Sequence, residues 1–113
     1  MTTLITRDAL RTAIDRGSVT VVDALPASYY AQQHLPGALN LVEADVDTQA
    51  ARVLPDPEAT IVTYCSNAAC GNSQAVANRL ARLGYTDVRK YRDGIEDWVA
   101  AGLPVESGVP AAS

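Results

Sequence analysis

Histidine and cysteine, two side chains that commonly bind transition metals, are scarce in this chain. Its single histidine is His34, and its two cysteines are Cys65 and Cys70. These three residues cannot complete the four-ligand set of a structural zinc site, and no Cys-x-x-Cys pair is present. We therefore expect no metal site.

A basic excess, a long apolar run and an N-terminal leader are also missing. The chain has 9 Lys and Arg against 13 Asp and Glu, a formal net charge of −4, whereas nucleic-acid-binding domains are normally basic. No apolar run is long enough to span a bilayer, and residues 1–5 lack the charged and apolar regions of a secretory signal. We expect a cytoplasmic protein with no nucleic-acid or membrane partner, whose cysteines are thiols, metal ligands or catalysts instead of a structural disulfide.

The composition is that of one globular domain. Of 113 residues, 48% are hydrophobic and 19% are charged, which are ordinary values for a protein with a packed core. No internal repeat or low-complexity block divides the chain. Because the last residues are small and include a proline, we predict a domain over 1–106 and a flexible C-terminal tail over 107–113.

Segments with the apolar spacing of helices alternate with short β-branched runs typical of strands. Thr6 is a capping residue for the first helix and Gly17 a stop signal, and Asp45 is placed to cap the third helix. The alternation predicts a single three-layer α/β/α domain with a mainly parallel central sheet. Helices are expected at 7–16, 26–33, 45–53, 72–83 and 95–101, and strands at 19–22, 39–41, 60–64 and 88–91.

Cys65 stands at the C-terminal end of the clearest predicted strand, before a loop of small residues and a helix. Ligands bind beyond the carboxyl ends of strands in sheets of this kind, and Asp23 and Arg92 also follow predicted strands. A small-residue loop can turn several backbone N–H groups toward one point, where a helix N-terminus adds its positive dipole end. We predict that Cys65 is a nucleophile and that Asp23 and Arg92 support its pocket. The predicted anion-binding loop is Ser66, Asn67, Ala68, Ala69, Cys70, Gly71 and Asn72.

Backbone alone would have to activate the thiol, because no positive side chain lies between Cys65 and Gln74. A free cysteine has a pKa of about 8.5 and is only a few per cent thiolate at pH 7. A well-placed helix terminus supplies up to about 2 kcal/mol, or ~1.5 pKa units. We therefore expect the pKa of Cys65 to lie near neutrality.

Each of these residues also has a plainer interpretation. Cys65 could be a small buried hydrophobe at a strand end. Cys70 either packs at the loop–helix junction or acts as a resolving or second thiol for Cys65. Asp23 is expected to be buried and hydrogen-bonded to a neighbouring loop. The aromatic side chains are expected in the core for Trp98 and at the pocket mouth for Tyr29 and Tyr30.

Three segments, in this order, resemble the signatures of rhodanese domains over about residues 4–105. The first is Val-Val-Asp at 21–23, followed by Tyr30 and by His-Leu-Pro-Gly-Ala-Leu-Asn at 34–40. The second runs from Thr-Tyr-Cys at 63–65 to Ser-Gln-Ala at 73–75. The third comprises residues 84–88, 94–98 and 101–105.

The resemblance implies a sulfurtransferase. The Cys65 thiolate would attack the outer sulfur of a small donor, thiosulfate or a persulfide, and become a persulfide cradled by the loop amides. A small or protein thiol, or cyanide in an assay, would then accept the sulfur. The resemblance implies no metal or organic cofactor, and it gives His34 a structural role in the turn before Pro36.

The chain departs from the rhodanese pattern in charge. Family members often have an Arg two positions after the aspartate, where this chain has Leu25, and many carry a basic residue in the active-site loop, where it has none. The loop is also longer than the commonest form. Losing a charge-assisted bond costs about 1.5–3 kcal/mol, so we expect poor thiosulfate activity or a different donor. The related phosphatase and arsenate-reductase functions are disfavoured for the same reason.

Three interpretations stay open at this point. We hypothesise that Arg92 partly replaces the missing loop charge, the alternative being a solvated arginine. The chain could also be a thiol–disulfide redox or sensing protein that uses Cys65 and Cys70. Finally, it could be a non-catalytic rhodanese-like binding module, although the cysteine at the nucleophile position argues against this.

Overall fold

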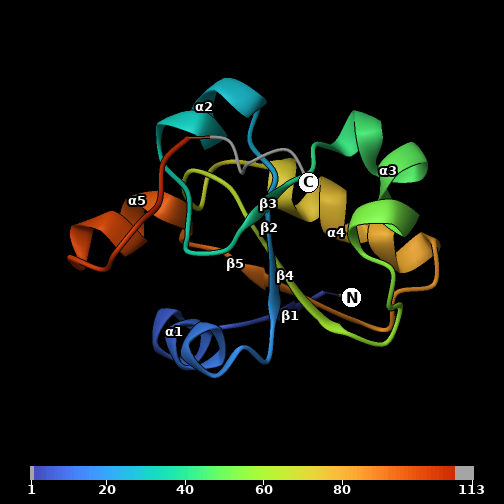
Figure 1. The fold of residues 1–113 in the computed structure, drawn as a ribbon, viewed down its shortest axis with the longest axis horizontal. Coiled ribbons are helices and arrows are strands. Elements are labelled where there is room, and N and C mark those ends of the chain that lie inside the picture. Colours follow the sequence, from blue (N-terminus) through green and yellow to red (C-terminus); the bar gives the residue numbers. More distant parts are fainter. Residues whose placement is uncertain (1, 109–113) are drawn as a thin grey trace.

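The two apolar runs predicted as buried strands lie side by side in the middle of a five-stranded sheet (Figure 1). The computed structural model describes residues 2–108. The strand order is β1-β5-β4-β2-β3, and every neighbouring pair is parallel, so the predicted fold class is confirmed. The strands are β1 Thr3–Leu4, β2 Thr20–Asp23, β3 Leu39–Asn40, β4 Thr60–Tyr64 and β5 Asp87–Tyr91. The helices are α1 Arg7–Arg16, α2 Ala27–Gln32, α3 Val46–Val53, α4 Asn72–Arg82 and α5 Gly94–Ala100, with a 3-10 turn at Glu43–Asp45.

Helices cover both faces of the sheet. Successive side chains of a strand point to opposite sides, and the central strands carry apolar side chains on both, so each face needs a cover. Val21 and Val62 pack in one apolar cluster with α1 and α5, whereas Val22 and Ile61 pack in a second cluster with α3 and α4 (Figure 1). Trp98 of α5 is 1% exposed, so the prediction that it fills the core is confirmed. Burial on both faces explains why β2 and β4 are nearly continuous apolar runs.

Capping residues define the ends of α1, but no side-chain cap starts α3. The Thr6 side chain accepts a hydrogen bond from the Ala9 N–H at 3.1 Å, and Gly17 adopts a left-handed φ of 65°, both as predicted. Asp45 makes no side-chain capping bond and belongs to the 3-10 turn before α3. The prediction of an Asp45 cap is therefore wrong: the chain enters α3 already helical, whereas a capping residue needs extended backbone.

Strand β1 was not predicted from the sequence. It pairs through Thr3 with Arg89 and through Leu4 with Lys90, and Leu4 is 57% exposed. Two residues carry no periodicity, and their pairing depends on β5, which lies far away in the chain.

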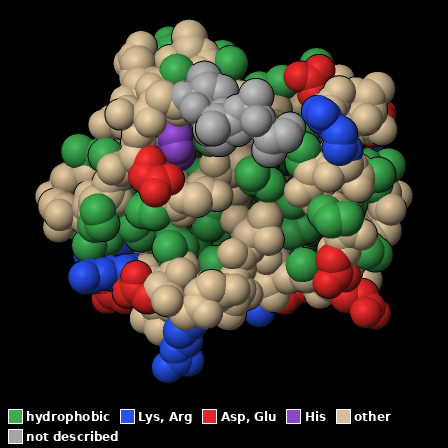
Figure 2. Space-filling view, viewed as in Figure 1, with side chains coloured by type: hydrophobic (Ala, Val, Ile, Leu, Met, Phe, Trp, Pro, Cys, Tyr) green, Lys and Arg blue, Asp and Glu red, His purple; other side chains and the backbone are tan. Residues whose placement is uncertain are grey.

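Charged side chains of both signs are scattered over the face in Figure 2. No helix of residues 2–108 is long and apolar enough to cross a membrane. Over the same residues, no three His, Cys, Asp or Glu side chains lie together as a metal would require. Of the predicted tail over 107–113, residues 109–113 lie outside the described residues, and the Gly108 N–H donates to the Ala31 carbonyl at 2.7 Å.

Candidate active site

Cys65 follows directly after β4, the middle strand of the sheet, at its carboxyl end. Its carbonyl accepts a hydrogen bond from the Ile95 N–H at 2.9 Å, and the Ser66 carbonyl accepts one from the Glu96 N–H at 3.0 Å. Both donors lie in the first turn of α5, so two N–H groups that a helix leaves without internal partners are satisfied here. The start of α5 thereby holds the start of the loop in place.

The loop after Cys65 is folded back on itself by Asn67. The Asn67 side-chain oxygen accepts from the Ala69 N–H at 2.9 Å, and its backbone carbonyl accepts from the Cys70 N–H at 3.1 Å. Its side-chain amide also donates to the Glu96 carboxylate at 2.9 Å. An asparagine that bonds its own backbone two residues on is a common turn former. The turn brings Cys70 back beside Cys65.

The Cys65 thiol is enclosed, and only 1% of the residue is exposed. Its Sγ lies 3.3 Å from the carbonyl oxygen of Cys70 and 3.4 Å from the hydroxyl oxygen of Ser73 in α4. Ser73 is buried in turn, and its carbonyl accepts a hydrogen bond from the Thr63 hydroxyl at 3.0 Å. Burial and the hydrogen bond with Cys70 raise the pKa of the Cys65 thiol, against smaller lowering contributions from Ser73. The expectation that the pKa of Cys65 lies near neutrality is therefore wrong.

The amide groups of the loop stabilise the other thiol. Burial alone would raise the pKa of Cys70, but a hydrogen bond with the Cys65 thiol and the N–H groups of Asn72 and Ser66 together lower it. The Ser66 side chain contributes in the same direction. Cys70 is only partly buried. The N–H groups of Ser66 and Asn72 therefore act on Cys70, and an anion-binding role of the loop stays a prediction.

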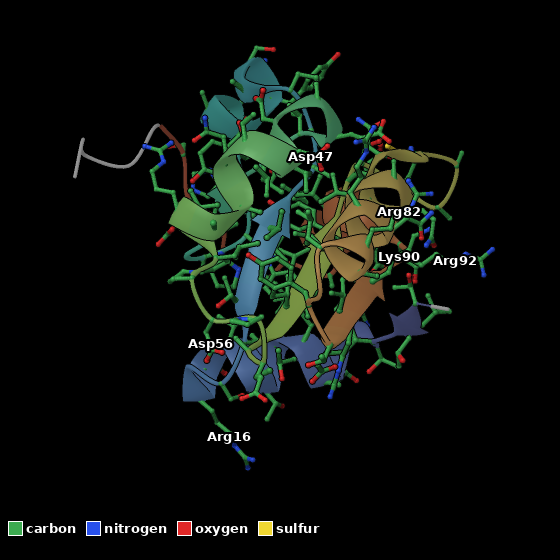
Figure 3. All side chains as sticks on the ribbon, turned by 90° about the vertical axis from the view of Figure 1, so that its right-hand side faces the viewer. Arg16, Asp47, Asp56, Arg82, Lys90 and Arg92 are labelled. Carbon is green, nitrogen blue, oxygen red and sulfur yellow. The ribbon has the colours of Figure 1, made fainter. Side chains whose placement is uncertain are left out.

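The loop has no positive side chain of its own, and one carboxylate lies beside it. Residues 66–72 contain no lysine or arginine, and the exposed Glu96 carboxylate is held beside the loop by Asn67. Arg92 lies instead in a groove of about 430 Å³ whose lining includes Arg7, Asp93 and Asp97. Its exposed side chain extends away from the ribbon (Figure 3) and makes no hydrogen bond or salt bridge with the described residues. A role of Arg92 toward a donor stays a prediction.

Asp23 ends β2, directly beside Tyr64 of β4. It is fully buried, and its carboxylate accepts from the Leu25 N–H at 2.8 Å and from the Tyr64 hydroxyl at 2.7 Å. The same Tyr64 oxygen accepts from the Leu35 N–H at 3.0 Å. Burial raises the pKa of Asp23, while these hydrogen bonds lower it by less. The expected burial and loop bonding of Asp23 are confirmed. A role in shaping a donor pocket stays a prediction.

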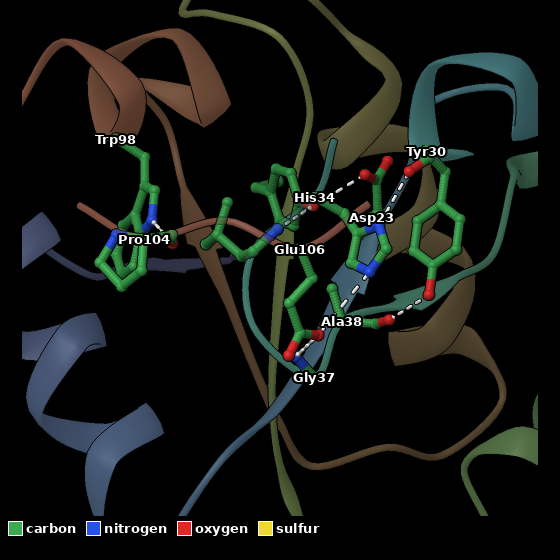
Figure 4. Close-up of polar contacts among 10 residues, drawn as sticks. Asp23, Tyr30, His34, Gly37, Ala38, Trp98, Pro104 and Glu106 are labelled. Atoms are coloured by element: carbon green, nitrogen blue, oxygen red, sulfur yellow. Dashed lines mark hydrogen bonds and ion pairs between the residues drawn. The ribbon is translucent and has the colours of Figure 1, made fainter. Parts of the chain in front are cut away.

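His34 belongs to a structural network rather than to the thiol site (Figure 4). It is 3% exposed, its ring stacks on Tyr30 with centroids 3.9 Å apart, and Nδ1 lies 2.8 Å from the Tyr30 carbonyl oxygen. Tyr30 is itself buried and donates to the Ala38 carbonyl at 2.5 Å. The structural role of His34 is confirmed, and the placement of Tyr30 at a pocket mouth is wrong because the ring packs in the core. Tyr29 is 57% exposed.

Sequence reasoning missed three residues of the site: Ser73, Gly94 and Glu96. Ser73 follows Cys65 by eight residues, in the first turn of α4, and that helix-start position is the one local signal for it. Gly94 and Glu96 reach the site through the packing of α5 against the loop. Nothing near either residue in the sequence points to that contact.

Comparisons with known proteins agree with this geometry. The family model described as Rhodanese-like domain matches residues 6–101. Thiosulfate sulfurtransferase PspE of Escherichia coli is 33% identical over 76 residues, which cover 67% of this chain and 70% of PspE. The crystal structure of the BH2092 protein from Bacillus halodurans matches with a TM-score of 0.85 and 28% identity, covering 94% of this chain and 77% of that one.

A longer relative carries a different name. The HTH-type transcriptional regulator Rv0324 of Mycobacterium tuberculosis is 38% identical over 106 residues, which cover 94% of this chain and 46% of the regulator. The chain thus spans about half the length of that relative.

Proposed function

The chain belongs to the rhodanese-like domain family, and on that premise we propose that it is a sulfurtransferase that carries sulfane sulfur as a persulfide on Cys65. The observation that carries the proposal is the position of one thiol. Cys65 Sγ sits at the carboxyl end of the middle strand, between the Cys70 carbonyl and the Ser73 hydroxyl. Ligands of open parallel sheets bind beyond this edge.

Cys65 needs a base, because burial favours its neutral thiol. Solvent base takes up this proton, and the thiolate fraction of Cys65 is the form that reacts, so the transfer itself does not depend on Cys70. The resulting Cys65 thiolate attacks the outer sulfur of a donor R–S–SH. The products are Cys65–S–SH and RS⁻, so atoms and charge balance. An acceptor thiolate then attacks the outer sulfur, takes it as its own persulfide and restores the Cys65 thiolate.

The charges favour a persulfide donor over thiosulfate. Thiosulfate is a dianion, whereas the loop over 66–72 offers only amides and the Glu96 carboxylate lies beside it. Losing a charge-assisted hydrogen bond costs about 1.5–3 kcal/mol, which corresponds to about a ten- to hundredfold weaker use of thiosulfate. We place this activity in the cytoplasm, with a small or protein thiol as the acceptor.

Two observations favour a second candidate, thiol–disulfide sensing. The thiols of Cys65 and Cys70 are hydrogen-bonded to each other, and the chain matches 46% of a protein named as a transcriptional regulator. A sensor of this kind would need oxidation of the two thiols but no transfer of sulfur.

Intact-protein mass spectrometry on two matched variants tests the proposal. Cys70→Ser and Cys65→Ser each retain one thiol, and each is incubated separately with thiosulfate and with glutathione persulfide. We expect Cys70→Ser to gain one sulfur atom from the persulfide, removable by cyanide, and Cys65→Ser to gain none. No adduct on Cys70→Ser from either donor contradicts the proposal and favours a sensing or binding module.

A further inference from the structure

Cys70 has chemistry that a one-thiol transfer cycle does not use. Its sulfur is hydrogen-bonded to the Cys65 thiol and accepts hydrogen bonds from the backbone N–H groups of Ser66 and Asn72. These contacts lower its pKa in spite of partial burial, and the thiolate is the form that attacks sulfur. A nucleophile is therefore held against the atom on which the proposed persulfide forms.

We propose that Cys70 is a second catalytic thiol, which attacks the Cys65 persulfide, closes a Cys65–Cys70 disulfide and releases hydrosulfide. This inference rests on the proposed function, since it needs a persulfide on Cys65. In the step, the Cys70 thiolate bonds to Cys65 Sγ while the bond from Sγ to the outer sulfur breaks. Cys70–S⁻ and Cys65–S–SH thus become the disulfide and HS⁻, and the outer sulfur leaves with the electron pair and its proton. The sulfane sulfur is reduced, and the two cysteines are oxidised.

The loop backbone holds Cys70 beside Cys65. The Cys70 N–H donates to the Asn67 carbonyl, and the Cys70 carbonyl oxygen lies 3.3 Å from Cys65 Sγ. The hydrogen bond between the two thiols places their side chains in contact, so closing the disulfide needs a local adjustment of the loop. The backbone turn therefore keeps Cys70 beside Cys65 before any persulfide forms.

The difference in exposure decides where the disulfide is reopened. Cys65 is 1% exposed, whereas Cys70 is only partly buried. Thiol–disulfide exchange requires access to the sulfur under attack, so an external dithiol attacks Cys70 and releases the Cys65 thiolate. A second exchange within the dithiol then frees Cys70. The complete cycle reduces one persulfide to a thiol and hydrosulfide, with a dithiol as the reductant.

A time course without added reductant tests the inference. Wild type, Cys70→Ser and Cys70→Ala are mixed with one equivalent of glutathione persulfide, alkylated at intervals and weighed intact, while sulfide is measured in parallel. We expect the wild-type persulfide to give way to a species lighter than the reduced chain by two hydrogen atoms, with one equivalent of sulfide. In both Cys70 variants the persulfide persists at least about tenfold longer, because the intramolecular nucleophile is lost.

A relocated thiol is the matched control. Ser18 is exposed and lies by the amino ends of β2 and β4, at the edge of the sheet away from Cys65. Ser18→Cys combined with Cys70→Ser restores the number of thiols but not the neighbour of Cys65. This double variant is expected to keep the long-lived persulfide of Cys70→Ser.

Three results overturn the inference and separate it from the proposed function. A wild-type persulfide as long-lived as that of Cys70→Ser overturns the role of Cys70 and leaves the Cys65 carrier intact. The absence of an adduct on Cys70→Ser overturns both. An adduct on Cys65→Ser with none on Cys70→Ser reverses the order of the two thiols and also overturns both.

Discussion

Gly94 lies directly against the backbone of Cys65, so close that an added Cβ would stand 2.5 Å from the Cys65 carbonyl oxygen. Gly94 also has a φ of 72°, which residues with a side chain rarely adopt. The contact allows the Ile95 N–H to reach the same carbonyl at 2.9 Å. Only glycine at position 94 therefore lets α5 approach the loop closely enough to make this hydrogen bond.

Gly94→Ala is expected to destabilise the fold and to displace Cys65. The left-handed backbone and the overlap together cost about 3 kcal/mol in the free energy of unfolding. Gly102→Ala is the control, because Gly102 has a similar φ of 75° with nothing within 4 Å of an added Cβ. It should cost about 1 kcal/mol. Urea unfolding of both variants checks this, and equal losses would show that the contact with Cys65 carries no energy.

The two thiols are expected to alkylate at different pH values. Iodoacetamide should modify wild-type Cys70 at lower pH than an ordinary cysteine, because its pKa is lowered, and Cys65 only at higher pH, because its pKa is raised. Fragmentation of the modified peptide assigns the site. In Cys65→Ser the Cys70 midpoint should move upward, because the hydrogen bond from Cys65 lowers the pKa of Cys70. A midpoint that stays in place would show that the two thiols do not share a proton.

Neutralising Glu96 is expected to improve the use of thiosulfate. Two unit charges at short range in water interact by about 1 kcal/mol. Removing the Glu96 charge therefore relieves a dianion of about 2 kcal/mol of repulsion, and Glu96→Gln should raise kcat/KM for thiosulfate by up to about thirtyfold. A buffer of low ionic strength keeps the effect visible, because salt screens exposed charges. Glu58→Gln, an exposed change at the amino end of β4, serves as the control of equal charge. The same gain from both variants would mean that net charge, and not the position of Glu96, limits the reaction.

The exposed Arg92 side chain is a candidate for binding the negative charge of thiosulfate. If it supplies the charge that the loop lacks, Arg92→Ala raises the KM for thiosulfate about tenfold and leaves the KM for glutathione persulfide unchanged. Arg16→Ala removes the same charge from the end of α1 (Figure 3) and should change neither value. An unaltered thiosulfate KM in Arg92→Ala would assign this side chain to the solvent.

Tyr64→Phe is expected to cost about 3 kcal/mol in the free energy of unfolding, because it removes one of the two hydrogen bonds to the buried Asp23 carboxylate and leaves the Leu35 N–H without a partner. Tyr29→Phe, at a tyrosine that is 57% exposed, should be nearly neutral. Chemical unfolding at neutral pH compares the two. Similar small losses would mean that water replaces the hydroxyl.

The hydrogen bond between Tyr64 and Asp23 also makes the free energy of unfolding depend on pH in a defined direction. Burial raises the pKa of Asp23 above 3.8 in the folded chain, so the folded state binds this proton first as the pH falls. As the pH falls from the raised pKa of the folded chain to 3.8, protonation of Asp23 therefore increases the free energy of unfolding. In Tyr64→Phe the rise should begin at higher pH, because the Tyr64 hydrogen bond lowers the pKa of Asp23. Unfolding at several mildly acidic pH values, with Asp23→Asn as the reference, measures this difference.

Much of the fold can be predicted from local sequence. The β-branched runs over 19–22 and 60–64 predict the two buried strands, and Thr6 and Gly17 delimit the first helix, because such signals act within a few residues. The position of Cys65 at a strand end follows from the same patterns. Asp45 shows the limit of this reasoning, since a capping residue type is not a cap when the preceding backbone is already helical.

The sequence by itself thus determined the α/β class, the parallel sheet and the edge at which Cys65 stands, because periodicity and turn residues act locally. Only the tertiary structure decided which sulfur the loop amides face. That outcome depends on the Asn67 turn and on the hydrogen bond from Asn67 to Glu96, two residues 29 positions apart. Contacts of this kind form when α5 packs against the loop, and no local pattern encodes them. The same holds for β1, whose two residues become a strand only because β5 lies beside them.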